Sequence, residues 1–348
     1  MKQQPWTDWH SKLHGTLRST RWLPPGSSIA IACSGGQDSL LLAKLLLDLQ
    51  PKWHWSLHLI HCDHQWRTDS AANAAFVMEW AQRCGLPATL CRADSDPDSS
   101  PESAPQPKTE AAARQWRYEQ LQTVAQQHQC GYVVTGHTAS DRAETLLFNL
   151  VRGSGSRGLG SLVPHRPLIP ELTLVRPLID WTRRETGQGC DDLQLTPWDD
   201  TTNTDLQYSR NRLRHQVMPL LHQHFNPQVE RTLAHTADRL HAESDFLDQC
   251  ARDALAVAAA DTQDPPHRLN RDRLAALPLA LQRRSLYLWL NRHCPKTNSF
   301  VAIERVIPLI SAPNRTQTPP FPGGGHVQVQ QSDLVWCPNS GPNPGNPP

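Results

Sequence analysis

The sequence has almost no charge imbalance, since 34 lysines and arginines face 33 aspartates and glutamates, for a formal net charge of +1. Charged residues make up 19% of the chain, against roughly 25% in an average domain. Any affinity for a polyanion must therefore come from local basic patches, because the chain as a whole carries so little net charge. The 38% of hydrophobic residues is still enough for a packed core.

Long hydrophobic runs and paired cysteines are also missing. No apolar run reaches the roughly 20 residues that a membrane helix needs, because Lys44 and Asp48 interrupt the best one, residues 40–49. Residues 1–21 contain no apolar signal core. The nine cysteines are scattered without a C-x-x-C pair, which argues against an iron–sulfur or zinc-ribbon framework and fits a reducing compartment. We therefore expect a cytoplasmic protein with no membrane association.

The first half of the chain alternates between strand and helix patterns. Short apolar runs predict strands at residues 28–33, 55–61, 86–91 and 132–135. Leucine-rich or alanine-rich segments between them predict helices at residues 40–49, 70–84, 109–129 and 139–151. Residues 94–107, rich in proline, serine and aspartate, predict a loop. This alternation predicts an α/β fold, a parallel sheet with helices on both faces.

The second part of the chain has a different character. At roughly 150 residues per domain, 348 residues suggest two domains. From about residue 226, helical patterns cover residues 226–260, 269–293 and 300–310, and only residues 326–330 and 334–336 resemble strands. Nine of the thirty prolines follow residue 312. We predict one domain at residues 1–222 and a smaller, mainly helical domain with a proline-rich tail at residues 223–348.

A glycine-rich loop lies where the first strand gives way to a helix, with the sequence Ser34-Gly-Gly-Gln-Asp-Ser39. Gly35 and Gly36 let backbone N–H groups approach an anion, and the helix that follows offers its positive end. The loop lacks the Gly-Lys-Ser/Thr ending of the kinase-type P-loop. Asp38 would repel bare phosphate, so its presence suggests a bridging Mg²⁺. The alternative is an ordinary glycine turn with a Ser/Asp cap.

Two acids and two arginines recur at helical spacing. Asp141 and Glu144 are three residues apart at the start of a predicted helix, so they share a face and could hold an ammonium group. Alternatively, they complement the helix dipole. Arg114 and Arg117 also share one helix face and could bind phosphates of ATP or RNA; a solvated helix face is the alternative.

Basic patches stand out in the middle of the chain. Residues 142–184 hold seven arginines against three acids. Arg210, Arg212 and Arg214 follow with no acid among them. Such patches are reasonable sites for an RNA backbone, whose binding would weaken with salt. Residues 152–160, rich in glycine and serine, predict a flexible loop that becomes ordered on substrate.

The loop at residues 34–39 resembles the SGGxDS loop of N-type ATP pyrophosphatases. Further segments resemble, in order, the bacterial tRNA(Ile)-lysidine synthetases within that superfamily; they are residues 61–67, 113–118, 135–145, 152–159, 176–178, 200–203 and 209–214. The resemblance covers roughly residues 20–222. It implies a Rossmann-like fold and an ATP-dependent ligation of lysine to carbon 2 of the wobble cytidine in tRNA(Ile) with a CAU anticodon. The reaction would pass through an adenylated tRNA and release AMP and pyrophosphate.

The resemblance also assigns residues. It implies that the nucleotide is bound by Ser34, Gly35, Gly36, Gln37, Asp38 and Ser39, with Asp38 as ligand of Mg²⁺. Catalytic roles fall on Asp38, His137, Asp141 and Glu144, and contacts with L-lysine or tRNA(Ile) on Arg114, Arg117, Asp141, Glu144, Arg210 and Arg214. The second domain would contact the tRNA. The oligomeric state stays open.

Some features depart from the family or favour rivals. Thr182-Arg-Arg-Glu185 runs into Thr186-Gly-Gln-Gly189, which predicts a short or broken helix. A second C-terminal domain of longer relatives is not expected here. The nearest rival is a tRNA thiolase on the same fold, but such enzymes rely on reactive or cluster-binding cysteines, and Cys33 is expected in the core. A non-catalytic nucleotide-binding module would leave the acid pair unexplained. A zinc site at His58, His61, Asp63 and His64 lacks a second ligand segment.

Overall fold

The computed structural model describes residues 6–66, 68–93, 109–199, 206–207, 209–261, 265–295, 299–322 and 324–338. Within it, Met1–His241 and Ala242–Pro348 form two compact units, and the division falls inside helix α10 (Val229–Ala258). The predicted loop at 94–107, the motif residues Arg67 and 200–203, and the end of the proline-rich tail lie outside the described residues. The predicted domain boundary at residue 222 stays a prediction.

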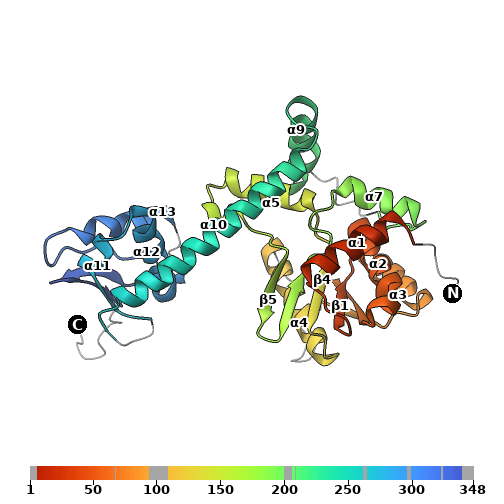
Figure 1. Cartoon of the computed structure of the whole chain (residues 1–348), viewed down its shortest axis with the longest axis horizontal. Coiled ribbons are helices and arrows are strands. Elements are labelled where there is room, and N and C mark those ends of the chain that lie inside the picture. Colours follow the sequence, from red (N-terminus) through yellow and green to blue (C-terminus); the bar gives the residue numbers. More distant parts are fainter. Residues whose placement is uncertain are drawn as a thin grey trace. The chain divides into compact units, whose positions relative to one another are not determined.

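The first unit is built on a six-stranded sheet with the order β3-β2-β1-β4-β6-β5. Figure 1 labels β1, β4 and β5 of this sheet. Strands β1 (Ser28–Ala32), β2 (Ser56–Asp63), β3 (Ala88–Arg92), β4 (Tyr132–Thr135) and β6 (Leu172–Val175) are parallel to their neighbours. Strand β5 (His165–Ile169) pairs antiparallel with β6 at one edge. Strands β1 to β4 confirm the prediction. Strands β5 and β6 were not predicted, because β5 is short and contains Pro167, and β6 is a four-residue run that follows a turn.

Helices cover both faces of this sheet, as predicted. Buried residues of α1 (Asp8–Thr20), α2 (Gln37–Trp53), α3 (Ser70–Arg83) and α7 (Arg183–Asp192) pack together with Ile29 and Ile31 of β1. Ala30, which points to the opposite face because side chains alternate along a strand, packs with α4 (Glu110–Gln127). The fold class is therefore confirmed for this unit.

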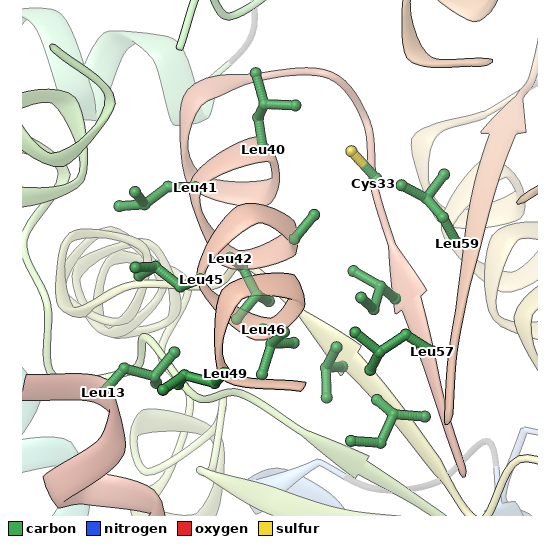
Figure 2. Packing of buried hydrophobic residues seen from close by; sticks show 14 of the residues in the cluster. Leu13, Cys33, Leu40, Leu41, Leu42, Leu45, Leu46, Leu49, Leu57 and Leu59 are labelled. Carbon is green, nitrogen blue, oxygen red and sulfur yellow. The ribbon is translucent and has the colours of Figure 1, made fainter. Parts of the chain in front are cut away.

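Helix α2 is buried on nearly all sides. In Figure 2, Leu57 and Leu59 of β2 lie on one side of α2, while Leu41 and Leu45 project to the other side. A helix that is apolar all round belongs in a core, which accounts for the leucine-rich sequence of residues 40–49. Its burial fixes the loop that precedes it.

Helix α5 (Ala139–Val151) follows β4 as predicted and is followed by one helical turn, α6 (Ser156–Leu159). The expectation of a loop at 152–160 is therefore wrong for this turn. Helix α7 is short, at 10 residues, as one alternative of the prediction had it, but it runs without interruption through Gly187 and Gly189, so the other alternative, a break, is wrong. A Cβ atom at Gly189 would lie 2.9 Å from Leu41 Cδ2, and glycine here lets α7 pack closely against α2.

The chain then forms α8 (Ser209–Arg212), a π-helix (Leu213–Val217) and α9 (Met218–His224) before α10. The second unit contains α11 (Arg271–Ala275), α12 (Leu279–His293), α13 (Phe300–Val306) and a 3₁₀ turn (Ile307–Ile310). Its sheet has the order β7-β9-β8, from β7 (Arg268–Asn270), β8 (His326–Gln330) and β9 (Asp333–Cys337), all antiparallel. Strands β8 and β9 confirm the strand-like runs at residues 326–330 and 334–336, whereas β7 was not predicted.

One predicted helix of the second unit is wrong in part. Residues 269–293 do not form one helix, because Arg268–Asn270 pairs with β9 and Pro278 precedes α12. A proline cannot supply the backbone N–H that a helix interior needs. The unit has its own core, which includes Leu286, Trp289 and Trp336.

Candidate active site

The glycine-rich loop has the predicted strand–loop–helix setting. Gly35 has φ +87°, and Gly36 is the N-cap of α2. A Cβ atom on Gly35 would lie 2.8 Å from Asn73 Nδ2 and 2.9 Å from Val77 Cγ2. Ser39 Oγ accepts a hydrogen bond from Ser34 N at 3.1 Å. The loop therefore needs glycine for both its conformation and its space, and it leads to the N-terminus of a 17-residue helix, a favourable site for an anion.

Asp38, in the first turn of α2, is held by α7. Thr186 Oγ1 donates to one carboxylate oxygen, and Arg183 Nη1 lies 3.1 Å from the other. Burial raises the pKa of Asp38 to about 6, with a contribution from Asp141, and Arg183, Thr186 and Gln37 oppose the rise. A carboxylate at this place could take part in binding a metal–phosphate complex.

The loop after β4 holds His137 and the beginning of α5. His137 Nδ1 lies 2.8 Å from Thr135 Oγ1. Burial lowers the pKa of His137 to about 3; the Asp141 carboxylate opposes the shift, and Arg176, Arg114 and Arg210 reinforce it. His137 is therefore neutral at physiological pH and a weak base.

The acid pair on α5 contacts an arginine of the π-helix. Asp141 Oδ2 accepts hydrogen bonds from Thr138 N at 2.8 Å and Thr138 Oγ1 at 2.9 Å, which caps α5. Glu144, 2% exposed, accepts from Arg214 Nε at 2.7 Å and Arg214 Nη2 at 2.9 Å. Arg214 Nη2 also lies 3.6 Å from Asp141 Oδ1. Asp141 therefore takes part in capping α5, and both acids face the Arg214 guanidinium, while their role in holding an ammonium group stays a prediction.

Protonation of the two acids differs. Burial would raise the pKa of Asp141, but His137, the Thr138 backbone N–H, Arg214 and Arg210 together lower it. The pKa of Glu144 is raised by burial and by Asp141, against the opposing effect of Arg214. Asp141 is therefore the more firmly ionised member of the pair.

The glycine-rich loop (residues 34–39) and the loop between β4 and α5 (residues 136–138) meet at Gly136. A Cβ atom on Gly136 would lie 2.8 Å from the carbonyl carbon of Asp38 and 2.8 Å from Ser39 N. Strands β1 and β4 are neighbours. From β1 the chain continues to β2 toward one edge of the sheet, and from β4 it continues to β5 and β6 toward the other edge. Ligand sites of open α/β folds lie at such a switch point, outside the carboxyl ends of the strands. Asp38 and Asp141 influence each other there.

The remaining predicted arginines lie around this place in different ways. Arg210 Nη2 donates to Thr145 Oγ1 at 2.8 Å. Arg114 is exposed, lies over the Tyr118 ring at 5.2 Å, and influences the pKa of His137. Arg117 is exposed on the same helix and acts electrostatically on Cys62 at the end of β2. Arg114 and Arg210 therefore belong to the surroundings of His137, whereas Arg117 lies beside a neighbouring strand end.

Two arginines of the predicted RNA patch are not available to RNA. Arg142 is 1% exposed and donates to both carboxylate oxygens of Asp238. Arg176 is 2% exposed and donates to the Val163 carbonyl. A buried, paired guanidinium cannot reach a phosphate at the surface, so the expectation is wrong for these two residues. Charge counting along the sequence does not detect burial.

Arg183 and Thr186 are functional candidates that the sequence analysis missed. The available signal was Thr182-Arg-Arg-Glu185, a capping box in which Glu185 accepts from Thr182 N at 2.8 Å. It marks a real helix start, which places Thr186 one turn into α7.

The histidines near β2 have separate partners. His61 Nδ1 lies 2.8 Å from the Cys33 carbonyl, and His58 Nε2 lies 2.8 Å from Thr89 Oγ1. Asp63 accepts from the Gln65 backbone N–H. Among the described residues, no three His, Cys, Asp or Glu side chains are grouped to hold a metal. Cys33 is 2% exposed and lies in the core, as predicted.

Two protein-family models match this chain. The family model described as "PP-loop domain" matches residues 9–221, and "TilS substrate binding domain" matches residues 269–335. A tRNA(Ile)-lysidine synthase of Nostoc sp. is 46% identical over 342 residues, covering 95% of this chain and 97% of the relative. The chain belongs to the tRNA(Ile)-lysidine synthase family.

Another member of the family, from Thermosynechococcus vestitus, is 47% identical over 324 residues, covering 93% of this chain and 90% of the relative. Membership makes the chain a PP-loop enzyme that uses ATP, a ligase that forms a carbon–nitrogen bond. Among solved structures, the U34-tRNA thiolase NcsA from Methanococcus maripaludis, with its [4Fe-4S] cluster, superposes with a TM-score of 0.56 at 17% identity. The superposition covers 68% of this chain and 78% of NcsA, and it shows the shared fold alone. In the described part of the chain, no helix has the length and apolarity to span a membrane.

Proposed function

We propose that this chain ligates L-lysine to carbon 2 of the wobble cytidine of tRNA(Ile) with a CAU anticodon. AMP is first transferred from ATP to the oxygen on carbon 2, and pyrophosphate leaves. The lysine ε-amine then attacks carbon 2, and the oxygen departs with AMP. The observation that carries the proposal is the meeting of the nucleotide loop and the acid pair at one switch point.

The nucleotide half of the proposed site consists of residues 34–39. Backbone N–H groups at Gly35, Gly36 and the first turn of α2, with the hydroxyls of Ser34 and Ser39, would bind the phosphates. The donor set fits Mg²⁺ only together with phosphate, because Asp38 supplies one carboxylate and Mg²⁺ takes one or two carboxylates plus phosphates and water. Mg²⁺ would neutralise charge at the phosphates, and Asp38 would hold it.

The amine half of the proposed site consists of Asp141, Glu144 and His137. Asp141 is suited to an ammonium group, because its pKa is lowered and it stays ionised. Burial would raise this pKa, but His137, the Thr138 backbone N–H and nearby arginines lower it. Glu144 already has a bidentate partner in Arg214, so lysine would join or displace that guanidinium. Neutral His137 would orient the amine by hydrogen bonding rather than remove its proton, since its pKa is only about 3.

For the tRNA, we propose contacts at Arg114 and Arg117 on α4 and at Arg210 on α8. The second domain would contribute further contacts, an assignment supported by the match of residues 269–335 to a substrate-binding family model. The base must leave its stack to be modified, so a pocket in the protein has to receive it. We expect the enzyme to work in the cytoplasm, where its tRNA substrate is found.

The test is the incorporation of radiolabelled lysine into a tRNA(Ile) transcript with a CAU anticodon, in the presence of ATP and Mg²⁺. We expect label on that transcript, no label on tRNA(Met) with the same anticodon letters, and one AMP released per lysine. Asp38→Ala should abolish pyrophosphate release. AMP formation without label would point to a different nucleophile, and unchanged pyrophosphate release in Asp38→Ala would contradict the site.

A further inference from the structure

Helix α7 contacts the glycine-rich loop at residues 34–39 through the side chains of Arg183 and Thr186. Gln37 Nε2 donates to the Arg183 carbonyl at 2.6 Å and to Thr186 Oγ1 at 2.9 Å. Thr186 Oγ1 in turn contacts Asp38 Oδ1, while Arg183 Nη1 lies 3.1 Å from Asp38 Oδ2. The carboxylate that is proposed to hold Mg²⁺ is therefore oriented by a helix about 150 residues later in the chain.

Counting protons fixes the direction of these hydrogen bonds. A threonine hydroxyl has one proton to donate. Thr186 Oγ1 has two acceptors in reach, the Arg183 carbonyl at 3.0 Å and the Asp38 carboxylate. Gln37 already donates to both the Arg183 carbonyl and Thr186 Oγ1, so the hydroxyl proton goes to Asp38, the charged and therefore stronger acceptor. The result is a directed relay from Gln37 through Thr186 to Asp38.

The relay is rigid because its members are fixed by packing. Thr186 is fully buried, at 0% exposure. Cys190, one turn later on α7, donates from Sγ to the Gln37 carbonyl at 3.5 Å. By contrast, the Arg183 side chain is 36% exposed. One oxygen of the Asp38 carboxylate therefore has a fully buried partner, Thr186, whereas the partner of the other oxygen, Arg183, is partly exposed to solvent.

We propose that Thr186, oriented by Gln37, is a positioning residue that presents Asp38 Oδ2 to the metal–phosphate group of bound ATP. The proposal rests on the proposed function in one respect, the assignment of Asp38 to Mg²⁺. It adds α7 to the machinery of the nucleotide half. Groups that orient a metal ligand determine how well that ligand binds the metal.

The experiment compares ATP binding, by equilibrium dialysis, without Mg²⁺ (in EDTA) and at saturating Mg²⁺. Wild type should bind ATP more tightly with Mg²⁺. We define the Mg²⁺ gain as the ratio of the ATP affinity at saturating Mg²⁺ to the affinity in EDTA. In Thr186→Val we expect Mg²⁺-free ATP binding to persist and the Mg²⁺ gain to shrink about 10–100-fold, the usual effect of losing a group that orients a metal ligand. Thr186→Ser, which keeps the hydroxyl, should retain the gain.

Two further variants separate positioning from structure. Thr182→Val removes the N-cap hydroxyl of the same helix without touching Asp38, so it should lower Tm and leave the Mg²⁺ gain intact. Gln37→Met removes the donor that directs the Thr186 proton, together with a weak contact of Gln37 Nε2 with Asp38 Oδ1 at 3.4 Å, and should reduce the gain by less than Thr186→Val does. Gln37→Met also tests the relay where Thr186→Val does not fold.

Several outcomes would overturn the proposal. They are an unchanged Mg²⁺ gain in Thr186→Val, an equal loss in Thr186→Ser, and the same loss in Thr182→Val. A wild type without any Mg²⁺ gain would also overturn it, because Asp38 would then not serve a metal. Failure of lysine incorporation alongside an intact pattern of ATP binding would count against the proposed function only.

Discussion

Glu144 is the least exposed of the three carboxylates in the candidate active site, with a side chain 3% exposed against 14% for Asp38 and 19% for Asp141. Its two hydrogen bonds both come from Arg214, whose own side chain is 20% exposed. A buried carboxylate of this kind depends on its partner, because water cannot replace the lost hydrogen bonds. Removing Arg214 alone should therefore be costly to the stability of the fold, because it would leave the buried Glu144 carboxylate without these two hydrogen bonds.

We expect Arg214→Met to destabilise the protein by about 3–5 kcal/mol, the cost of leaving a buried charge unpaired. The double variant Arg214→Met/Glu144→Gln should recover much of this loss, since the uncompensated charge is gone. Urea unfolding of the wild type, both single variants and the double variant measures the coupling. Additive losses would show that the two side chains do not depend on each other.

At this scale, sequence reasoning named candidate residues but not the side chains that contact them. The loop residues and the spacing of Asp141 and Glu144 are local patterns, so they were accessible from the sequence. Arg214 reaches Glu144 across 70 residues, and Thr186 reaches Asp38 across 148. Such pairings depend on tertiary structure, and no periodicity in the sequence encodes them.

At the scale of elements, α7 is held by a small ionic network at its beginning. Glu185 Oε1 accepts from Lys12 Nζ at 2.6 Å and from Arg231 Nη2 at 2.8 Å, while Oε2 accepts from Thr182 N. Burial would raise the pKa of Glu185, but the hydrogen bonds from Lys12, Thr182 and Arg231 lower it to about 2. One carboxylate thus joins α7 to α1 and α10.

This network predicts a pH dependence of stability. Because the folded pKa of Glu185 is below the unfolded value of 4.5, its contribution is complete above about pH 5 and is lost as pH falls toward 2. We expect Glu185→Gln to lower Tm at pH 7 and the difference from wild type to shrink between pH 5 and pH 2. Thermal unfolding across this range measures it; a constant difference would mean that the Glu185 charge does not matter.

Element boundaries were predictable where one local signal dominated. Helix α5 matches its prediction at both ends because Thr138 caps it and the apolar period is regular. Helix α7 was expected to be short or broken; it is short but continuous, because tertiary packing against α2 outweighs the weak helix propensity of glycine. Strand β7 was mistaken for helix, since three residues carry too little pattern and its pairing with β9 is distant in sequence.

At the scale of the whole molecule, the two units have separate hydrophobic cores. Leu42 lies in the core of the first unit and Leu286 in that of the second, and both are fully buried. Sequence composition already indicated a change of character near residue 226. In the small antiparallel sheet of the second unit, β8 and β9 had been indicated by the strand-like runs at residues 326–330 and 334–336, and only the three-residue strand β7 was missed.

Separate cores predict separate responses to core mutation. We expect Leu42→Ala and Leu286→Ala each to cost about 2–5 kcal/mol within its own unit. Hydrogen exchange followed by mass spectrometry should show Leu286→Ala lowering protection in β8 and β9 but not in β1 and α2, with the reverse for Leu42→Ala. Equal losses in both units for either variant would indicate one cooperative unit instead.

The contact at Gly136 has a consequence for how such an enzyme can change. Because the backbone of Asp38 and Ser39 fills the space beside Gly136, the loop at residues 34–39 and the loop before α5 cannot move independently. A redesign of residues 137–145 for a different nucleophile should therefore keep glycine at residue 136 and vary the side chains around it.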